Sequence, residues 1–265
     1  MSTNPYAAPR AQVADETIDL RGDFLPAGRK VPTGNGWTWI SAAWSIFRAK
    51  AGLWIATAVV LSVIYLALFV AYTLFPFVGA ILFTLLSPVY AAGLVIMSRA
   101  IDRGGDARFN QLFAGFTHRL GALLTVGIVY FIANLVIGVG VFWLLGADMS
   151  MSAIPADPTA ALMLTSKVAV AGLIVMALML PVVMAVWFAP ALIALHEMAP
   201  IEAMKHSFSG GLKNMLPFLL YGIVLLVASV IASIPALLGW LVLGPVIGAS
   251  IYTSYRDIYF TEPAA

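Results

Sequence analysis

Residues 51–98 read AGLWIATAVVLSVIYLALFVAYTLFPFVGAILFTLLSPVYAAGLVIMS, and none of these 48 residues is Asp, Glu, Lys or Arg. A helix needs about 20 apolar residues to cross a bilayer, so this stretch is long enough for two spans joined near Phe75–Phe77. Three further stretches also lack these four residue types: Leu120–Ala147, Val168–Leu195 and Asn214–Tyr255. They contain 28, 28 and 42 residues, enough for one, one and two spans. The sequence therefore predicts six transmembrane helices.

The composition agrees with a membrane location. Apolar residues make up 62% of the chain and charged residues 10%, against roughly 45–50% and 25% in soluble domains. The predicted fold class is therefore all-α: a polytopic membrane protein with six transmembrane helices in three hairpins, and three interfacial amphipathic helices on the cytoplasmic side. The chain has no cysteine, which excludes disulfides, thiolate metal sites and cysteine nucleophiles.

The basic residues predict the orientation. If the six spans alternate, thirteen of the fourteen Lys and Arg residues fall on the side that holds both termini. Only Lys167, in the predicted loop Gly146–Lys167, falls on the other side. Basic residues next to spans are retained in the cytoplasm, so we expect a multi-pass protein with both termini cytoplasmic. The first 35 residues contain no apolar signal-peptide core, and the first span is expected to act as an uncleaved signal-anchor.

A weak threefold pattern runs along the chain. Each of three sections opens with apolar residues at helical spacing, continues with a span, and ends with a second span containing proline. The sections cover residues 37–99, residues 107–145 with 168–197, and residues 200–258. The apolar positions are Trp37, Ile40, Trp44 and Phe47, then Phe109, Leu112, Phe113, Phe116 and Leu120, then Ile201, Met204, Phe208 and Leu212. We expect one six-helix domain over residues 37–260, with these stretches at the membrane surface.

Small residues inside the spans are predicted to let helices pack closely. The expected packing positions are Gly79, Gly93, Gly138, Gly140, Gly172, Gly222, Gly244 and Gly248. Pro181 and Pro190 are expected to kink the fourth span. Residues 1–36 are rich in Pro, Ala, Gly and charge, and are predicted to be a disordered cytoplasmic tail. Its segment Asn4–Pro9 is either a docking peptide or part of a solvated tail.

The spans carry little chemistry. Ionisable residues inside a membrane usually mark transport paths, and none lies deep in a predicted span. Asn134 is the one strongly polar amide in a span, and we expect it to form a hydrogen bond between helices. His196-Glu197 begins like a zinc-protease helix, but Pro200 stands where that motif needs a second histidine. The sequence predicts no catalytic residue, no metal site and no cofactor, so we expect a protein that is not an enzyme.

The cytoplasmic side holds the only candidate site. Basic residues close to the predicted spans attract anionic lipid, each contributing about 1 kcal/mol. The alternatives are orientation and anchoring, or a binding ring for anionic head groups or for an acidic segment of a partner protein. The candidate residues are Arg48, Lys50, Arg99, Arg103, Arg108, Arg119, Lys205, Lys213 and Arg256. The expected partners are membrane lipids and a protein of unknown identity, with no nucleic acid.

Four segments of the chain carry a family resemblance: Val31–Ile40, with its Gly36-Trp37 pair, Trp187–Leu192, Leu212–Phe218 and Ser254–Asp257. In these segments the chain resembles an uncharacterised family of bacterial inner-membrane proteins. The resemblance covers roughly residues 31–260 and implies a proteobacterial-type, multi-pass protein of the bacterial inner (plasma) membrane with about six spans. The architecture is similar to the membrane domain of some glycerophosphodiester phosphodiesterases. Their catalytic domain has no counterpart here, so the resemblance implies no activity.

Two functions remain open on the sequence. The leading hypothesis is a non-enzymatic membrane scaffold that organises lipid or a partner through its basic cytoplasmic face. The alternative is a permease-like protein that moves an apolar or amphipathic solute between spans kinked by proline. A continuous cavity between the spans near Asn134 would favour the permease, and a tightly filled bundle would favour the scaffold.

Overall fold

The computed structural model describes residues 22–145 and 157–261, and every named element in these ranges is helical. The helices are α1 (Asn35–Ala49), α2 (Ala51–Leu74), α3 (Pro76–Asp102), the 3-10 helix η1 (Phe109–Phe113), α4 (Ala114–Thr117), α5 (Leu120–Leu145), α6 (Pro158–Trp187), α7 (Ala189–His196), α8 (Pro200–Lys213), α9 (Met215–Ser233) and α10 (Trp240–Tyr259). The all-α prediction is confirmed. The predicted segment 4–9 lies outside the described residues.

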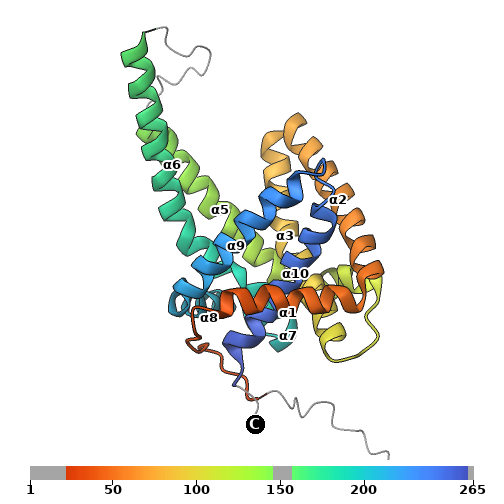
Figure 1. Cartoon of the computed structure of the whole chain (residues 1–265). Helices are drawn as coiled ribbons and strands as arrows, with labels where there is room; N and C mark the ends of the chain where they lie inside the picture. Colours follow the sequence, from red (N-terminus) through yellow and green to blue (C-terminus); the bar gives the residue numbers. More distant parts are fainter. Residues whose placement is uncertain (1–21, 146–156, 262–265) are drawn as a thin grey trace, which may run out of the picture.

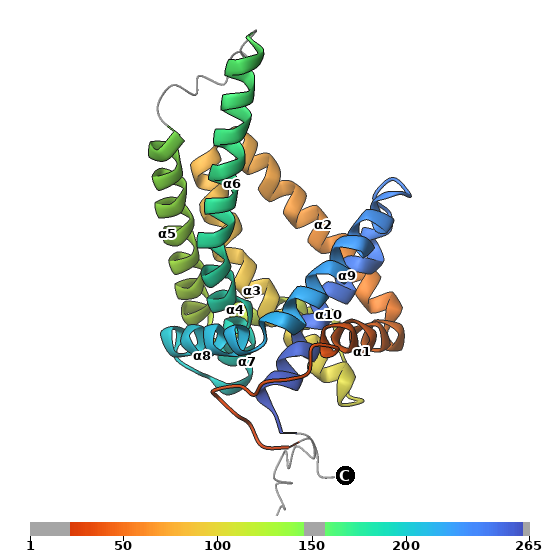
Figure 2. The ribbon, with the colours of Figure 1, turned by 60° about the vertical axis from the view of Figure 1, so that its left-hand side comes forward.

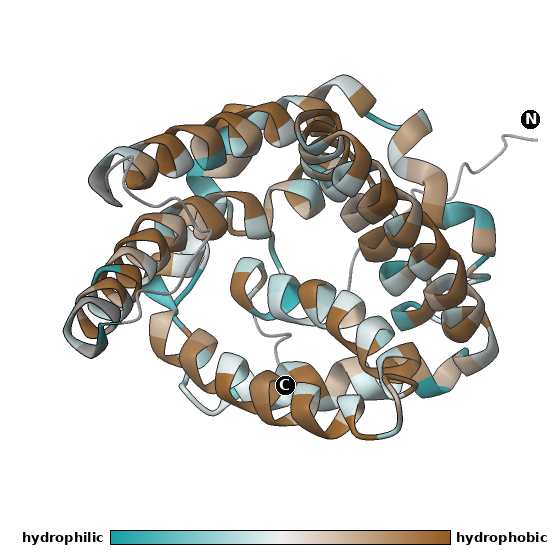
Figure 3. Cartoon of the chain, turned by 90° about the horizontal axis from the view of Figure 1, so that it is seen from above, coloured by the Kyte–Doolittle hydropathy of each residue, from teal (hydrophilic) through white to brown (hydrophobic). Residues whose placement is uncertain are grey.

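Five segments of the described chain are long and apolar enough to cross a membrane: Ala51–Leu74, Pro76–Asp102, Leu120–Trp143, Leu162–His196 and Met215–Ser233. These segments suggest a multi-pass membrane protein. Few side chains are buried in four of these segments, whereas the second half of α3 is largely buried. Figure 3 shows how apolar the long helices are along their length. Only hydrocarbon would cover such a surface without a penalty.

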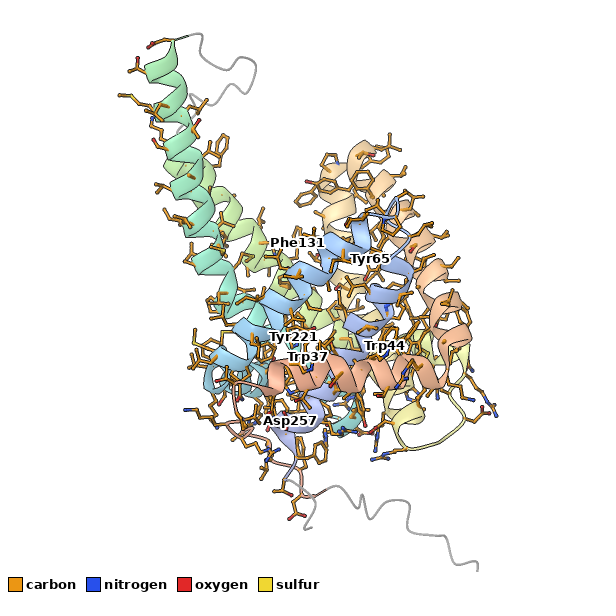
Figure 4. All side chains as sticks on the ribbon, viewed as in Figure 1. Trp37, Trp44, Tyr65, Phe131, Tyr221 and Asp257 are labelled. Carbon is orange, nitrogen blue, oxygen red and sulfur yellow. The ribbon has the colours of Figure 1, made fainter. Side chains whose placement is uncertain are left out.

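The long helices rise from one end of the molecule, which we call the base (Figure 1). Helices α1 and α8 lie across this end, with α4 and α7 beside them (Figure 2). Helices α2 and α3 form a hairpin, with the rings of Tyr65 and Phe83 5.6 Å apart, and α5 joins α3 where Phe77 meets Phe131 at 5.7 Å (Figure 4). The α5–α6 hairpin leans away from α9 and α10, so the bundle is open on that side.

The three sections of the sequence interlock at the base. The opening helix of the first section, α1, packs on α9 and α10 of the third. The opening helices of the second, η1 and α4, pack on α3 of the first, and α8 of the third packs on α6 and α7 of the second. Each section therefore uses its opening helix to cover a hairpin of another section. This cyclic packing agrees with the threefold pattern of the sequence.

At two of these contacts, a glycine allows the helices to approach each other closely. A Cβ atom on Gly36 of α1 would lie 2.3 Å from the carbonyl oxygen of Pro217, and one on Gly93 of α3 would lie 2.1 Å from that of Leu112. Of the predicted packing glycines, Gly79, Gly93 and Gly248 do lie against neighbours. The prediction was wrong for five others, which have no atom of the described chain within 4 Å of that position: Gly138, Gly140, Gly172, Gly222 and Gly244. These five positions face open space.

The helix is interrupted at Phe188, between α6 and α7. Pro190 lacks the N–H group that would continue the helix ladder, and α7 begins with it in the first turn. The hydroxyl of Ser207 in α8 accepts a hydrogen bond from the Phe188 N–H (2.9 Å) and donates one to the Met184 carbonyl (2.6 Å). The predicted kink at Pro190 is therefore a break that α8 stabilises. Pro181 lies inside α6.

Two boundaries differ from the sequence analysis. Lys167, predicted in a loop, lies on α6, which begins at Pro158. The second opening stretch is a 3-10 turn followed by a single α-helical turn rather than one amphipathic helix. His118 ends that turn in an extended conformation, and Arg119 then adopts a φ of 59°. These two residues turn the chain into α5.

The segment Gly22–Gly34 is bound to the folded domain. Phe24 forms an antiparallel bridge with Phe260, and the Leu25 N–H donates to the Tyr259 carbonyl at 2.8 Å. The Arg29 N–H donates to Ile258 at the same distance. The domain therefore includes residues that the sequence analysis placed in the tail. Both ends of the described chain lie at the base.

Helix α10 is the most enclosed of the long helices. Pro245, Val246, Ala249 and Tyr252 are buried on it, and it contacts α1, α2, α3 and α9. Its second half carries Ser, Thr, Tyr, Arg and Asp residues, most of which hydrogen-bond to other parts of the chain. Because protein rather than lipid surrounds it, α10 is more polar than the five apolar segments.

Candidate functional site

All nine basic candidates lie at the base. Helices α2, α5 and α9 begin there and α3 and α10 end there, so residues next to these ends gather at one face (Figure 4). The structure divides these residues into two groups. The side chains of one group bond to other residues of the chain, and those of the other group are exposed.

Five of the nine interact within the chain. Arg256 pairs with Asp102 (2.6 Å), and Arg108 pairs with Asp106 (2.8 Å). The Arg119 guanidinium donates to the Glu197 carbonyl at 2.5 Å. The Lys213 ammonium donates to the carbonyls of Ala27 (2.8 Å) and Gly28 (3.0 Å), which holds the N-terminal segment in place. Arg103 also interacts with other groups of the chain. These side chains stabilise the base, and the nine residues do not form one ring.

The side chains of three candidates are exposed and form no hydrogen bond or ion pair with the described residues: Arg48, Lys50 and Lys205. We call them the free cations. The first two end α1 and precede α2, next to the stacked rings of Trp44 and Phe47, whose centroids are 5.3 Å apart. The third is on α8. The ninth candidate, Arg99, is half-buried at the end of α3.

A cluster around Asp257 is the main polar feature that the sequence analysis missed. Its carboxylate accepts hydrogen bonds from Arg29 (2.9 Å), Asn35 (2.8 Å) and the indole of Trp39 (2.7 Å). It borders a cavity of about 420 Å³ that also contains Asp102. The cluster ties the N-terminal segment and α1 to α10. With its oxygens satisfied in this way, Asp257 has a structural role.

The histidines do not assemble a metal site. His196 hydrogen-bonds Tyr255 and stacks on Phe24 at 3.6 Å between ring centroids, while His206 is 3.8 Å from Glu202. In residues 22–145 and 157–261, no three His, Asp or Glu side chains gather closely enough to hold a metal ion. His196 instead fixes the end of α7 against the C-terminal segment.

An apolar groove lies between α6 and α9. It has a volume of about 570 Å³, with Gly211 of α8 at its floor. The α6 wall includes Leu180, Val183 and Trp187, and the α9 wall includes Phe218, Gly222 and Leu226. Nearly all of its lining is apolar. No sequence signal marked it, because it depends on the angle between two hairpins.

Asn134 takes no part in this groove. Its side-chain N–H donates to the Tyr130 carbonyl at 2.8 Å within α5. The prediction of a hydrogen bond between helices was wrong, because the amide bonds to a carbonyl of its own helix instead. The groove instead adjoins α8 at the base.

Comparison of the chain with protein-family models, curated proteins and solved structures finds no match. The resemblance described above stays a prediction. The groove, the free cations and the exposed apolar surface are the features of the described chain that point to a function.

Proposed function

We propose that this protein is a non-enzymatic scaffold of the bacterial inner membrane that organises anionic lipid or a partner protein at its base. The base lies at the cytoplasmic leaflet, and both termini are cytoplasmic. The single observation that carries the proposal is the presence of unpaired cations beside exposed aromatic rings on helices that lie across the ends of apolar spans. Such a surface suits the region where head groups meet acyl chains.

Six spans agree with the position of the chain ends. The N-terminal segment and residue 260 are paired at the base, which supports an even number of crossings. Five segments are apolar enough to cross, and α10 returns the chain from the end of α9. Its 20 residues extend about 30 Å at 1.5 Å per residue, which is the thickness of the hydrocarbon core. We therefore take α10 as a sixth span, lined by protein.

Helix α1 has two apolar faces, which supports an interfacial position. Trp39 and Ala43 are buried against α9 and α10, whereas Trp37 and Trp44 are 58% and 42% exposed. A soluble protein gains nothing by exposing two tryptophans, but the bilayer interface favours this residue. Lipid would cover the outer face while protein covers the inner one. On α8, the exposed Ile201 and Leu212 suggest the same arrangement.

The free cations provide the test. Replacing Arg48, Lys50 and Lys205 together by Gln should reduce binding of phosphatidylglycerol and cardiolipin, each charge contributing about 1 kcal/mol. Lipids retained after purification in mild detergent would be counted by native mass spectrometry. Lys167→Gln, on an exposed cation of α6 far from the base, is the control. Equal retention of anionic lipid by all three proteins would refute the lipid role.

The permease alternative gains support from one observation, the groove beside Pro181 of α6. Transporters use proline-interrupted helices around a central cavity. A fluorescent fatty acid that crosses vesicles containing the protein faster than protein-free vesicles would favour this function. Equal rates would exclude it for that class of solute.

A further inference from the structure

We propose that the groove between α6 and α9 is a binding site for one acyl chain of a diacyl lipid from the leaflet at the base. The inference rests on the proposed membrane location and adds a site that the basic surface does not contain. The chain would enter sideways from the bilayer, with its head group level with α8.

The walls of the groove are held apart by the fold. Helix α6 packs mainly on α5, α7 and α8, whereas α9 packs on α1, α8 and α10. The two walls approach each other at α8, where a Cβ atom on Gly211 would lie 3.3 Å from the Met184 side chain. Above this floor nothing in the described chain fills the gap. A void inside a bilayer forfeits dispersion contacts, so the surrounding hydrocarbon is expected to fill it.

The depth of the groove matches one leaflet. Its α9 wall runs from Met215 to Leu226, eleven residue steps, which is about 17 Å at a rise of 1.5 Å per residue. Half of a hydrocarbon core about 30 Å thick is about 15 Å. The α9 wall is therefore about as long as one leaflet is thick, which is the length over which a single acyl chain extends. Its volume of about 570 Å³ lies within the range of small-ligand sites, about 300–1,000 Å³.

The lining excludes a polar ligand. The one hydroxyl among the lining residues belongs to Tyr221, and it is 2.6 Å from the Ser250 hydroxyl in a buried hydrogen bond. Trp187 also lines the groove, and its indole N–H is a donor without a hydrogen-bond partner in the described residues, but this atom is buried, with the rings of Phe218 and Tyr221 against the indole. A solute carrying charge would lose its hydration in this groove without compensation. A saturated acyl chain has no polar group and therefore loses no hydration there.

Gly222 allows a direct test. It lines the groove, and a Cβ atom there would meet no atom of the described chain within 4 Å. A leucine at this position should fill the groove without straining the helix, since leucine favours helix over glycine by nearly 1 kcal/mol. Gly138→Leu is a matched control, because Gly138 has the same open surroundings on α5 but lies away from the groove. Leu226→Trp is a second variant that narrows the upper end.

The experiment uses the full chain in phosphatidylglycerol vesicles that contain a lipid with a photoreactive group in mid-chain. After illumination, adducts are mapped by mass spectrometry of peptides. We expect adducts at residues 180–187 and 219–226 in the wild type and in Gly138→Leu, and their loss in Gly222→Leu and Leu226→Trp. The thermal stability of Gly222→Leu in detergent should equal or exceed that of the wild type.

Two results would overturn the inference. They are the absence of groove adducts in the wild type, and equal adducts in the two leucine variants. A chain that failed to enter vesicles would instead refute the proposed membrane function. If lipid binding depended on the anionic head group but no groove adducts formed, the proposed lipid-binding role of the basic surface would stand and only the acyl-chain site would be refuted.

Discussion

Asn214, at the junction of α8 and α9, is the residue whose replacement should most clearly release the N-terminal segment. Its fully buried side chain accepts a hydrogen bond from the Val31 N–H (2.8 Å) and donates to the carbonyls of Arg29 (2.8 Å) and Gly210 (2.9 Å). Two of these bonds hold the segment. A hydrogen bond contributes about 1 kcal/mol net, and a buried group left unpaired costs about 1–3 kcal/mol. Asn214→Ala should therefore weaken docking of the segment by about 2–3 kcal/mol.

Limited trypsin digestion measures this release. The segment contains cleavage sites after Arg29 and Lys30, which should be cut when the segment opens. When closing is fast compared with cleavage, the cleavage rate follows the open population, so the expected increase is roughly 30- to 150-fold. Asn134→Ala is the control, because that amide bonds within its own helix. Equal cleavage at these sites in the two variants would refute the role assigned to Asn214.

Two further substitutions test how the helices are joined. Ser207→Ala removes the hydroxyl that bridges the break between α6 and α7 and should destabilise the protein by about 1–3 kcal/mol; thermal unfolding in detergent should show a lower midpoint, with Ser166→Ala, on the exposed surface of α6, unchanged. Gly93→Val places a side chain 2.1 Å from the Leu112 carbonyl oxygen and should cost about 3 kcal/mol or more. Gly138→Val should fold normally, and equal yields of the two valine variants after size-exclusion chromatography would contradict the proposed close approach.

The helical segments were largely predictable from the sequence, because a charge-free block has few other ways to satisfy its backbone in a bilayer. The turn expected near Phe75–Phe77 is confirmed, since α2 ends at Leu74 and α3 begins at Pro76. The charge-free block Asn214–Tyr255 was less informative about its second helix. Its last helix is surrounded by protein, and lack of charge does not distinguish a lipid-facing helix from a buried one.

The surface that each helix presents could not be predicted. In α1 the apolar spacing marked Trp37, Ile40, Trp44 and Phe47. Of these only Phe47 is buried, and the other buried apolar side chains of the helix are Trp39, Ala43 and Ile46. A helix that is apolar on two sides does not reveal which side contacts protein. The ion pair between Arg256 and Asp102 and the docking of Arg29 on Asp257 join residues more than 150 positions apart. Only the fold brings such residues together, and the groove arises in the same way.

Topology is the most direct test of the account. Because the chain has no cysteine, Lys205→Cys at the base and Lys167→Cys on α6 each introduce a single thiol. A maleimide that cannot cross membranes should label Lys167→Cys in intact cells and Lys205→Cys only after the membrane is opened. Labelling of both thiols from the same side would contradict a bundle that spans the membrane with its base in the cytoplasm.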